Sequence, residues 1–477
     1  MGQEIDQSKF KKQDFVRFQQ ALEKETRLLS EWFTDKTFAN DDLTGGFELE
    51  AWLIDDDFRP APINDQYLKA LNDPLAVPEL AKFNVEVNST PQSLHGNALK
   101  RMEMELNQTW KRCNEVAQET GVKLLMTGIL PTVRDSDLTL ANMSHMTRYK
   151  ALNEQVFRMR GGKPIKLDIY GREHLVTEHQ DVMLESAATS FQIHLQTPLD
   201  RSVDCYNTSI ILSAPMVAMS ANSPYLFGKD LWDETRIPLF EQAVAVGGMA
   251  GAAFGPVRRV SFGTDFARGS LMDCFEENRQ HFPVLLPIQC SDIAEEMTHL
   301  SLHNGTIWRW NRPLIGFNDK GVPHVRIEHR VTSAGPSVLD LISNAAFFFG
   351  LSSFFLYEPG QSLAGKISFA QARDNFYAAA KTGLDASFVW KGKKVSALTL
   401  LREELLPQAR TGLERLALAA DDIDSYLGVV EARLDKACNG ATWQRQFVDK
   451  YGRDMKALTV AYYERQCSGL PIHEWDI

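Results

Sequence analysis

Acidic, imidazole and guanidinium side chains recur at alternate positions in four short segments of this chain. The segments are GFELEAW with Glu48 and Glu50, FNVEVN with Glu86, SFQIHLQ with Gln192 and His194, and VRIEHRV with Arg326, Glu328 and Arg330. Carboxylate oxygens are the ligands that Mg2+ prefers, and Mn2+ also accepts an imidazole. Arginines beside them suit a ligand that carries phosphates or carboxylates, because a guanidinium can donate two parallel hydrogen bonds. Metal ions together with arginines indicate phosphoryl transfer, in which the protein mainly positions groups and neutralises charge.

The alternation predicts that each segment is a β-strand with one polar and one apolar face, because side chains at i and i+2 share a face. The apolar faces carry Phe47, Leu49 and Ala51; Phe83, Val85 and Val87; Phe191, Ile193 and Leu195; and Val325 and Ile327. Several carboxylates that converge on one side of a sheet repel one another. The polar faces therefore either hold cations together or do not converge.

Each segment taken alone has a simpler interpretation. Two glutamates on a strand are usually a solvated face, and a lone histidine such as His194 is usually hydrogen-bonded in a structural role. Glu328 between Arg326 and Arg330 could form surface ion pairs, each contributing roughly 0 to 1 kcal/mol. The four segments share one pattern, however, and this favours a common divalent-metal site.

Composition excludes several classes of partner. The chain has 477 residues, room for a large core, and a formal net charge of -11, which argues against nucleic acid or an anionic membrane as partner. A local arginine cluster would still allow ATP to bind. The six cysteines have no CxxC spacing and the N-terminus has no apolar signal segment, so we expect a cytoplasmic protein. The longest apolar stretch, 345–357, is too short to span a bilayer and is expected to be a buried helix.

Helical and strand patterns divide the chain into two parts. Helices are expected at 8–33, 95–120 and 203–220, and further strands at 122–127 and 257–262. After Arg330 the pattern is helical, at 337–357, 369–381, 396–406, 421–438 and 443–467. No GxxxxGK[ST], GxGxxG, GxSxG or HExxH motif is present, so any ATP would bind on the sheet.

Four longer segments carry a family resemblance over about residues 45–385. They are GFELEAWLID, PMVAMSANSPYLFGKDLWDETR, NGTIWRWNRP together with VRIEHRV, and ARDNFYAAAKTGLDA. The chain resembles glutamate–cysteine ligase family 2, carboxylate–amine ligases of the glutamine-synthetase-like superfamily. The resemblance implies an α+β fold in which a curved, mostly antiparallel sheet forms a funnel flanked by helices. It also implies a catalytic domain at 1–385, with its N-terminal helix at 8–33, and a helical extension at 386–477 packed on it.

The resemblance implies that ATP phosphorylates the γ-carboxylate of L-glutamate and that an amine then displaces the phosphate. With L-cysteine as the amine, this is the first step of glutathione biosynthesis. Two or three Mg2+ (or Mn2+) ions would be held by Glu48, Glu50, Glu86, His194 and Glu328. Arg330, Glu328 and Arg236 would be catalytic, with Arg330 facing the phosphoryl group. Substrate or ATP contacts would come from Arg148, Tyr149, Gln192, Asn222, Arg309, Arg312 and Arg326.

Several points stay open at this level. Asn222 could instead cap a turn, Tyr149 could belong to the core, and Arg309 and Arg312 could pair with surface acids. Many family members have a histidine where Gln192 stands, and this puts a second imidazole contact in doubt. Glu185 is a candidate for accepting the proton of the amine. The turn at 161–164 or the loop near Gly263 could serve as a lid.

Three alternatives to a glutamate–cysteine ligase also remain. The first is a ligase for another amine, the second a phosphotransferase of the guanidino-kinase type, and the third a binding protein without catalysis. The partners expected are small molecules, with no nucleic acid and no membrane, and a homo-oligomer is possible.

Overall fold

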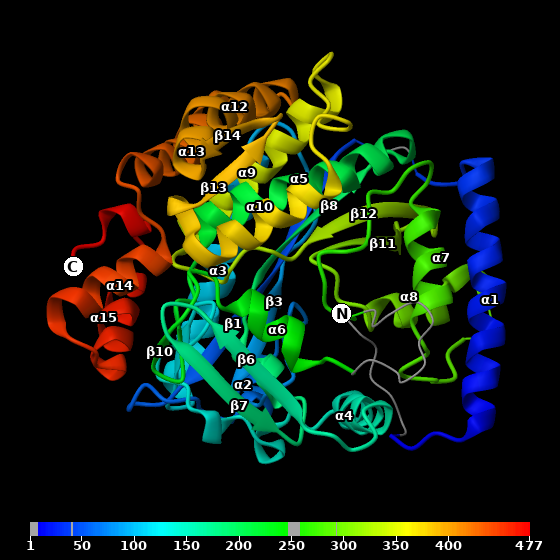
Figure 1. The fold of residues 1–477 in the computed structure, drawn as a ribbon, viewed down its shortest axis with the longest axis horizontal. Helices are drawn as coiled ribbons and strands as arrows, with labels where there is room; N and C mark the ends of the chain where they lie inside the picture. Colours follow the sequence, from blue (N-terminus) through cyan, green and yellow to red (C-terminus); the bar gives the residue numbers. More distant parts are fainter. Residues whose placement is uncertain (1–7, 40–41, 247–257, 292) are drawn as a thin grey trace.

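A curved antiparallel sheet organises the molecule (Figure 1). The computed structural model describes residues 8–39, 42–246, 258–291 and 293–477. Within these residues the sheet has eight strands, with the order β11-β12-β8-β1-β3-β2 and with β4 and β5 paired to β1. The strands are β1 Thr44–Ile54, β2 Ala76–Pro78, β3 Asn84–Asn88, β4 Gln92–Ser93, β5 Lys123–Leu125, β8 Phe191–Thr197, β11 Asn311–Phe317 and β12 Pro323–His329. The predicted α+β class with a curved antiparallel sheet is confirmed.

The register of this sheet sets polar side chains directly opposite one another. Every pairing in it is antiparallel, so residues that alternate along one strand meet residues that alternate along the next. The opposed pairs are Glu50 with Glu86, Glu48 with Gln192, His194 with Glu328, and Glu328 with Arg312. All four predicted strands therefore lie in one sheet and present their polar residues to one side.

The opposite side of the sheet is buried against helices. The α-helices of the described residues are α1 Lys12–Asp35, α2 Asn64–Leu71, α3 Ala98–Glu119, α4 Thr147–Met159, α5 Ser202–Ser220, α6 Arg236–Ala243, α7 Met272–His281, α8 Thr298–Gly305, α9 Val338–Tyr357, α10 Phe369–Thr382, α11 Ala397–Thr399, α12 Leu406–Arg415, α13 Ala420–Asp435, α14 Gly440–Tyr451 and α15 Met455–Cys467. Of these, α3, α5 and α9 contact strands of the sheet. Phe47, Leu49, Phe191 and Ile193 are each at most 3% exposed, as the alternation predicted. Phe349 of α9 lies directly against the backbone of β1.

Helix α9 is a core helix. It is 20 residues long, in agreement with the predicted helix at 337–357, and contains the apolar stretch 345–357. By length and composition it is the one helix in the described part of the chain that could cross a membrane. Its most apolar window is 94% buried inside the fold, so the prediction of a buried helix is confirmed. The close approach of α12 to α9 depends on glycines. A Cβ at Gly412 would lie 1.8 Å from the carbonyl oxygen of Gly350.

Other predicted elements differ from the structure in identifiable ways. The expected strand at 257–262 is wrong for its described residues, which form only a single bridge between Ser261 and Arg309, and Val257 lies outside the described residues. The expected helix at 443–467 is two helices, α14 and α15. Three hairpins were not predicted: β6 Ile165–Tyr170 with β7 His174–His179, β9 Tyr225–Leu226 with β10 Lys229–Asp230, and β13 Ser387–Trp390 with β14 Lys393–Ser396.

Candidate active site

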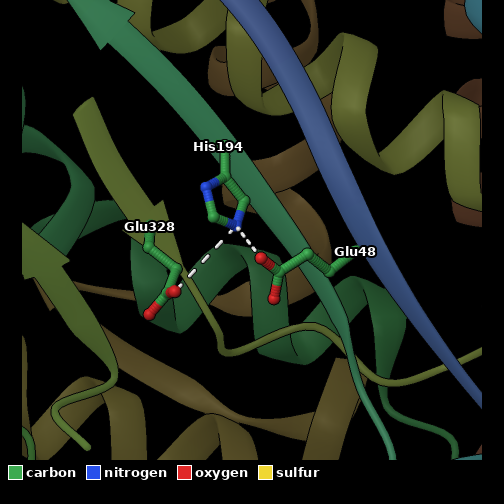
Figure 2. Close-up of side chains that lie close together, drawn as sticks. All are labelled: Glu48, His194 and Glu328. Carbon is green, nitrogen blue, oxygen red and sulfur yellow. Dashed lines mark ion pairs between the residues drawn. The ribbon is translucent and has the colours of Figure 1, made fainter. Parts of the chain in front are cut away.

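Three strands bring Glu48, His194 and Glu328 together on the polar side of the sheet (Figure 2). The His194 Nε2 atom lies 3.4 Å from Glu48 Oε1 and 3.9 Å from Glu328 Oε1. This nitrogen is buried and has no hydrogen-bond partner among the described residues. One ligand atom from each of the three side chains lies within 4.8 Å of the others. A cation between them would satisfy the nitrogen and neutralise the carboxylates.

The tautomer of His194 is constrained by Arg326. The Arg326 Nε donates to His194 Nδ1 at 3.3 Å, so Nδ1 acts as an acceptor in this arrangement. Burial lowers the pKa of His194, which keeps the ring neutral and leaves the proton on Nε2. A cation bound at Nε2 needs that lone pair. Its binding therefore requires the proton to move to Nδ1 and Arg326 to leave its contact.

Glu328 is the most strongly paired carboxylate of the site. Arg312 donates to both of its oxygens, from Nε at 2.9 Å and Nη2 at 3.0 Å, and Arg330 Nη1 donates at 3.1 Å. Burial opposes ionisation of this carboxyl, but the charges of Arg312, Arg330 and His194 outweigh it and hold its pKa well below the ordinary value. Glu328 therefore anchors two arginines as well as facing His194.

A second acidic cluster joins Glu50, Glu79 and Glu86, whose carboxylate oxygens lie within 4.8 Å of one another. Burial, reinforced by the charge of Glu79, raises the pKa of Glu50 to about 7. Burial together with Glu48, Glu79 and Glu50 raises the pKa of Glu86 well above its usual range. Carboxylates this close repel one another when ionised, and a bound cation would relieve that repulsion.

Glu79 was not predicted as a site residue. It follows the short edge strand β2 directly, within a stretch rich in Pro and Asp whose alternation is too brief to indicate a strand. The pairing of β2 with β3 places it beside Glu86, seven residues later in the chain. The available signal was a carboxylate directly after the Val-Pro dipeptide. This signal becomes informative only once the pairing of β2 with β3 is known.

Gln192 links the second cluster to Arg330. Its Nε2 donates to Glu50 Oε1 at 2.8 Å, and its Oε1 accepts from Arg330 Nη1. An amide can do both at once, whereas a neutral imidazole in the same place would offer a single donor and a single acceptor in a different geometry. Gln192 thus orients Glu50 and Arg330 at the same time.

A cavity of about 550 Å³ lies over the polar side of the sheet, and its lining changes from one edge to the other. Towards β11 and α8 the lining contains most of the apolar side chains, Leu286, Ile288, Leu300, Leu302, Trp308, Leu314 and Ile315, among polar residues that include Gln289, Glu296, Thr298, Ser301 and Thr306. Charged lining residues extend across the sheet from β11 and β12 to β1 and β3, and they include Arg312, Arg326, Glu328, Arg330, Glu48, Glu50, Glu79 and Glu86. Arg148 and Tyr149 also line it, and Arg148 donates to the Tyr149 hydroxyl at 2.7 Å.

A smaller polar recess adjoins this cavity and shares Glu50, Glu79, Glu185 and Arg330 with it. Arg236 lines the recess and is held in place on one side. Its Nε donates to Glu234 at 3.0 Å and its Nη2 donates to the Val331 carbonyl at 2.7 Å. The arginine thus enters the recess from a fixed direction.

Two predicted contact residues lie outside the cavity lining. Asn222 is 0% exposed and binds the Ala334 carbonyl, Tyr462 and Gln444, so it joins the end of α5 to the C-terminal helices. Arg309 is also buried and pairs with Glu277 at 3.1 Å. Within the described residues, neither the turn at 161–164 nor Gly263 contributes to the lining, and Glu185 contributes to both parts.

Comparison with known proteins agrees with this architecture. A family model described as glutamate–cysteine ligase family 2 matches residues 44–466. The fold is similar to that of the glutamate–cysteine ligase from Francisella tularensis solved in complex with AMP, with a TM-score of 0.57 and 12% sequence identity over 90% of each chain. A bifunctional glutathione synthetase from Pasteurella multocida matches with a TM-score of 0.51 and 10% identity, over 92% of this chain and 55% of that one. The search of curated proteins gave no match.

The two structural likenesses, at 12% and 10% identity, show a shared fold. The family match covers the sheet, the cavity and the helices from α2 to α15. It therefore includes every strand that carries the two acidic clusters. The chain belongs to glutamate–cysteine ligase family 2, a family of ATP-dependent carboxylate–amine ligases.

Proposed function

We propose that this protein is an ATP-dependent ligase that forms a γ-glutamyl amide through γ-glutamyl phosphate, with L-cysteine as the first acceptor to test. One observation carries the proposal. The carboxylates of both acidic clusters and the guanidinium groups of Arg312, Arg326 and Arg330 line one cavity, whose apolar side chains gather near α8 and β11. Such a cavity can hold a nucleotide base, a polyphosphate with its cations and a small amino acid in a row.

The cavity lining suggests where each substrate binds. The wall formed by α8, residues 286–290 and β11, here called the apolar wall, carries most of the apolar side chains of the cavity. It suits the adenine, because a base is flat and largely apolar. The triphosphate would then lie along Arg312, Arg326 and Arg330, over the acidic clusters. The adjoining recess offers both charges that an amino acid requires, with Arg236 for a carboxylate and Glu79 for an ammonium group.

Glu48, His194 and Glu328 would hold one cation, and Glu50, Glu79 and Glu86 another. Bound there, Mg2+ would offset the repulsion between the attacking carboxylate and the γ-phosphate. Arg330 supplies positive charge from the protein itself. Gln192 and Glu328 hold its Nη1, while its buried Nε has no hydrogen-bond partner among the described residues and can donate to an anion. Because this charge is fixed before reaction, little reorganisation is needed as charge develops.

The second half-reaction needs a neutral amine, so a nearby group must accept a proton. Glu185 lies at the boundary between the cavity and the recess. Burial and the charges of Glu79 and Glu50 raise its pKa to about 8, so the ionised form of Glu185 is a stronger base than an ordinary carboxylate. Glu185 is thus the proposed proton acceptor.

The test is ADP release in a coupled assay with ATP, L-glutamate and a panel of amino acids and amines, with and without Mg2+. The expected result is release that requires glutamate, Mg2+ and an acceptor together, and a product whose mass equals that of the γ-glutamyl amide. A stable phosphorylated product without condensation would instead favour a phosphotransferase. Nucleotide binding without turnover under any mixture would favour a binding protein.

A further inference from the structure

Helix α1 lies outside the segment that matches the family, since the match begins at residue 44 and α1 ends at Asp35. In Figure 1 it runs along one side of the molecule beside α7 and α8. Most of its surface away from these helices is charged and exposed, but one acidic side chain points inward. Glu25 is 2% exposed, a position that glutamates rarely occupy without partners.

Glu25 caps the start of α8. Its Oε2 accepts the backbone N–H of Leu300 at 2.7 Å, and its Oε1 accepts from His299 Nδ1 at 2.6 Å. The residue that precedes the helix, Met297, has a left-handed backbone and no capping side chain. A carboxylate from α1 therefore takes the place that a local cap would fill, where the helix dipole also favours negative charge.

His299 connects Glu25 to a second segment, residues 286–290. Its Nε2 accepts the backbone N–H of Cys290 at 3.4 Å, so the proton lies on Nδ1 and points to Glu25. The ring is 3% exposed and packs edge-on against Phe18 of α1, with centroids 5.1 Å apart. Glu25 and His299 together, here called the α1–α8 dyad, tie α1 to both α8 and residues 286–290.

Both of these segments form the apolar wall of the cavity. Residues 286–290 contribute Leu286, Ile288, Gln289 and Cys290, and α8 contributes Leu300, Ser301, Leu302 and Asn304. The carbonyl of Asn304 also accepts from Arg312 Nη1 at 3.3 Å, and Arg312 is the residue that grips Glu328. A displacement of α8 would therefore move the apolar wall and the arginine together.

We propose that Glu25 is a positioning residue for nucleotide binding, acting through His299 on the wall that receives the base. This inference rests on the proposed function for the identity of the ligand. The effect should be specific to the nucleotide, because the recess lined by Arg236 and Glu185 contains no residue of α8 or of residues 286–290.

The test compares Glu25→Gln and His299→Gln with Glu23→Gln, a control two residues away on the exposed side of α1. Glu25→Gln replaces one carboxylate oxygen with an amide NH2, which then faces either the backbone N–H of Leu300 or the Nδ1–H of His299. Because two donors cannot bond to each other, one of the two hydrogen bonds is lost. We expect the KM for ATP and the Kd of a non-hydrolysable ATP analogue to rise about five- to tenfold. The KM for glutamate should change less than about twofold, and Glu23→Gln should resemble the wild type.

Binding of the analogue, measured by calorimetry, does not require turnover, so it separates this inference from the proposed function. A wild-type protein that binds the analogue but releases no ADP would remove the proposed reaction and leave the dyad testable by Kd. An unchanged Kd in folded Glu25→Gln would overturn the inference, as would an equal rise in KM for both substrates. Loss of folding in both dyad variants would also overturn it, because the pair would then support the fold alone.

Discussion

The Glu328 carboxylate belongs both to the acidic cluster with Glu48 and His194 and to the group of arginines in the site. It faces His194 within the first acidic cluster, and it receives three hydrogen bonds from Arg312 and Arg330. Removal of the side chain would leave two buried guanidinium groups without their counter-charge, which typically costs about 3–5 kcal/mol. A test of its chemical role therefore needs a substitution that keeps its shape.

We predict that Glu328→Gln abolishes most glutamate-dependent ADP release while the protein stays folded. The amide oxygen can still accept from Arg312, but the lost charge weakens the hold on Arg330 and on a cation beside His194. Steady-state kinetics and circular dichroism of purified protein would measure this, with the exposed Glu431→Gln as control. Near-normal turnover in Glu328→Gln would remove this residue from the catalytic group.

Glu79 allows a test of the second cluster alone. We predict that Glu79→Gln raises the Mg2+ concentration needed for half-maximal activity by at least about tenfold, because an oxygen ligand loses its charge. Direct Mn2+ binding, followed by electron paramagnetic resonance, should weaken in parallel. Glu119→Gln, on the exposed side of α3, serves as the control. An unchanged Mg2+ dependence would leave only Glu50 and Glu86 as candidate ligands there.

At the level of elements, the packing of α12 on α9 leaves no room for a side chain at the point of closest contact. Helix α12 crosses α9 where Gly412 meets Gly350, and a Cβ on Gly412 would lie 1.8 Å from a backbone carbonyl that cannot rotate away. We predict that Gly412→Ala lowers the free energy of unfolding by about 1–3 kcal/mol despite the better helix propensity of alanine. Denaturant unfolding would measure the change.

The matched control is Gly428→Ala in α13, where an added Cβ meets no atom within 4 Å. This change should leave stability equal or raise it by up to about 1 kcal/mol, since alanine favours the helix. Equal effects of both substitutions would contradict the view that close backbone contact holds α12 against α9. The kinetic constants of folded Gly412→Ala should be unchanged, because this crossing lies away from the cavity lining.

Strand alternation made the central elements predictable, because a period of two separates the faces of each strand without any knowledge of its partners. The segments around Glu48, Glu86, His194 and Glu328 were found this way. Glu79 and the β6–β7 hairpin were missed for different reasons. Glu79 depends on the pairing of a three-residue strand, while Ile165, Leu167 and Ile169 alternate visibly but carry no candidate chemistry.

Sequence could not place Asn222 or Arg309 relative to the cavity. Both belong to motifs that carry the family resemblance, yet their side chains bind partners from distant parts of the chain. Asn222 contacts Tyr462, 240 residues later. A motif identifies a residue as constrained, but whether the constraint comes from a ligand or from packing depends on contacts that only the fold supplies.

At the scale of the whole molecule, the site concentrates negative charge in a protein that is already acidic, with a net charge of -11. Burial raises the pKa of Glu50 to about 7 and that of Glu185 to about 8, compared with an ordinary value of 4.5. Between pH 4.5 and these values the folded protein holds protons that the unfolded chain releases. The free energy of unfolding contributed by these groups therefore falls as the pH rises through that window.

This linkage predicts how Mg2+ affects thermal stability. A cation requires ionised carboxylates and competes with the retained protons, so it should bind more tightly at pH 8 than at pH 5.5. We expect Mg2+ to raise the melting temperature by about 2–5 °C at pH 8 and by less at pH 5.5. Scanning calorimetry with EDTA or Mg2+ at matched ionic strength would measure both shifts.

Glu79→Gln is the control variant for this experiment, since it removes the charge that contributes most, after burial, to the raised pKa values of Glu50 and Glu185. Without Mg2+ its melting temperature should depend less on pH than that of the wild type, because Glu50 and Glu185 would then ionise closer to their ordinary range. Its stabilisation by Mg2+ at pH 8 should also shrink. Equal Mg2+ shifts at both pH values in the wild type would mean that the cation binds elsewhere, on groups already ionised at pH 5.5.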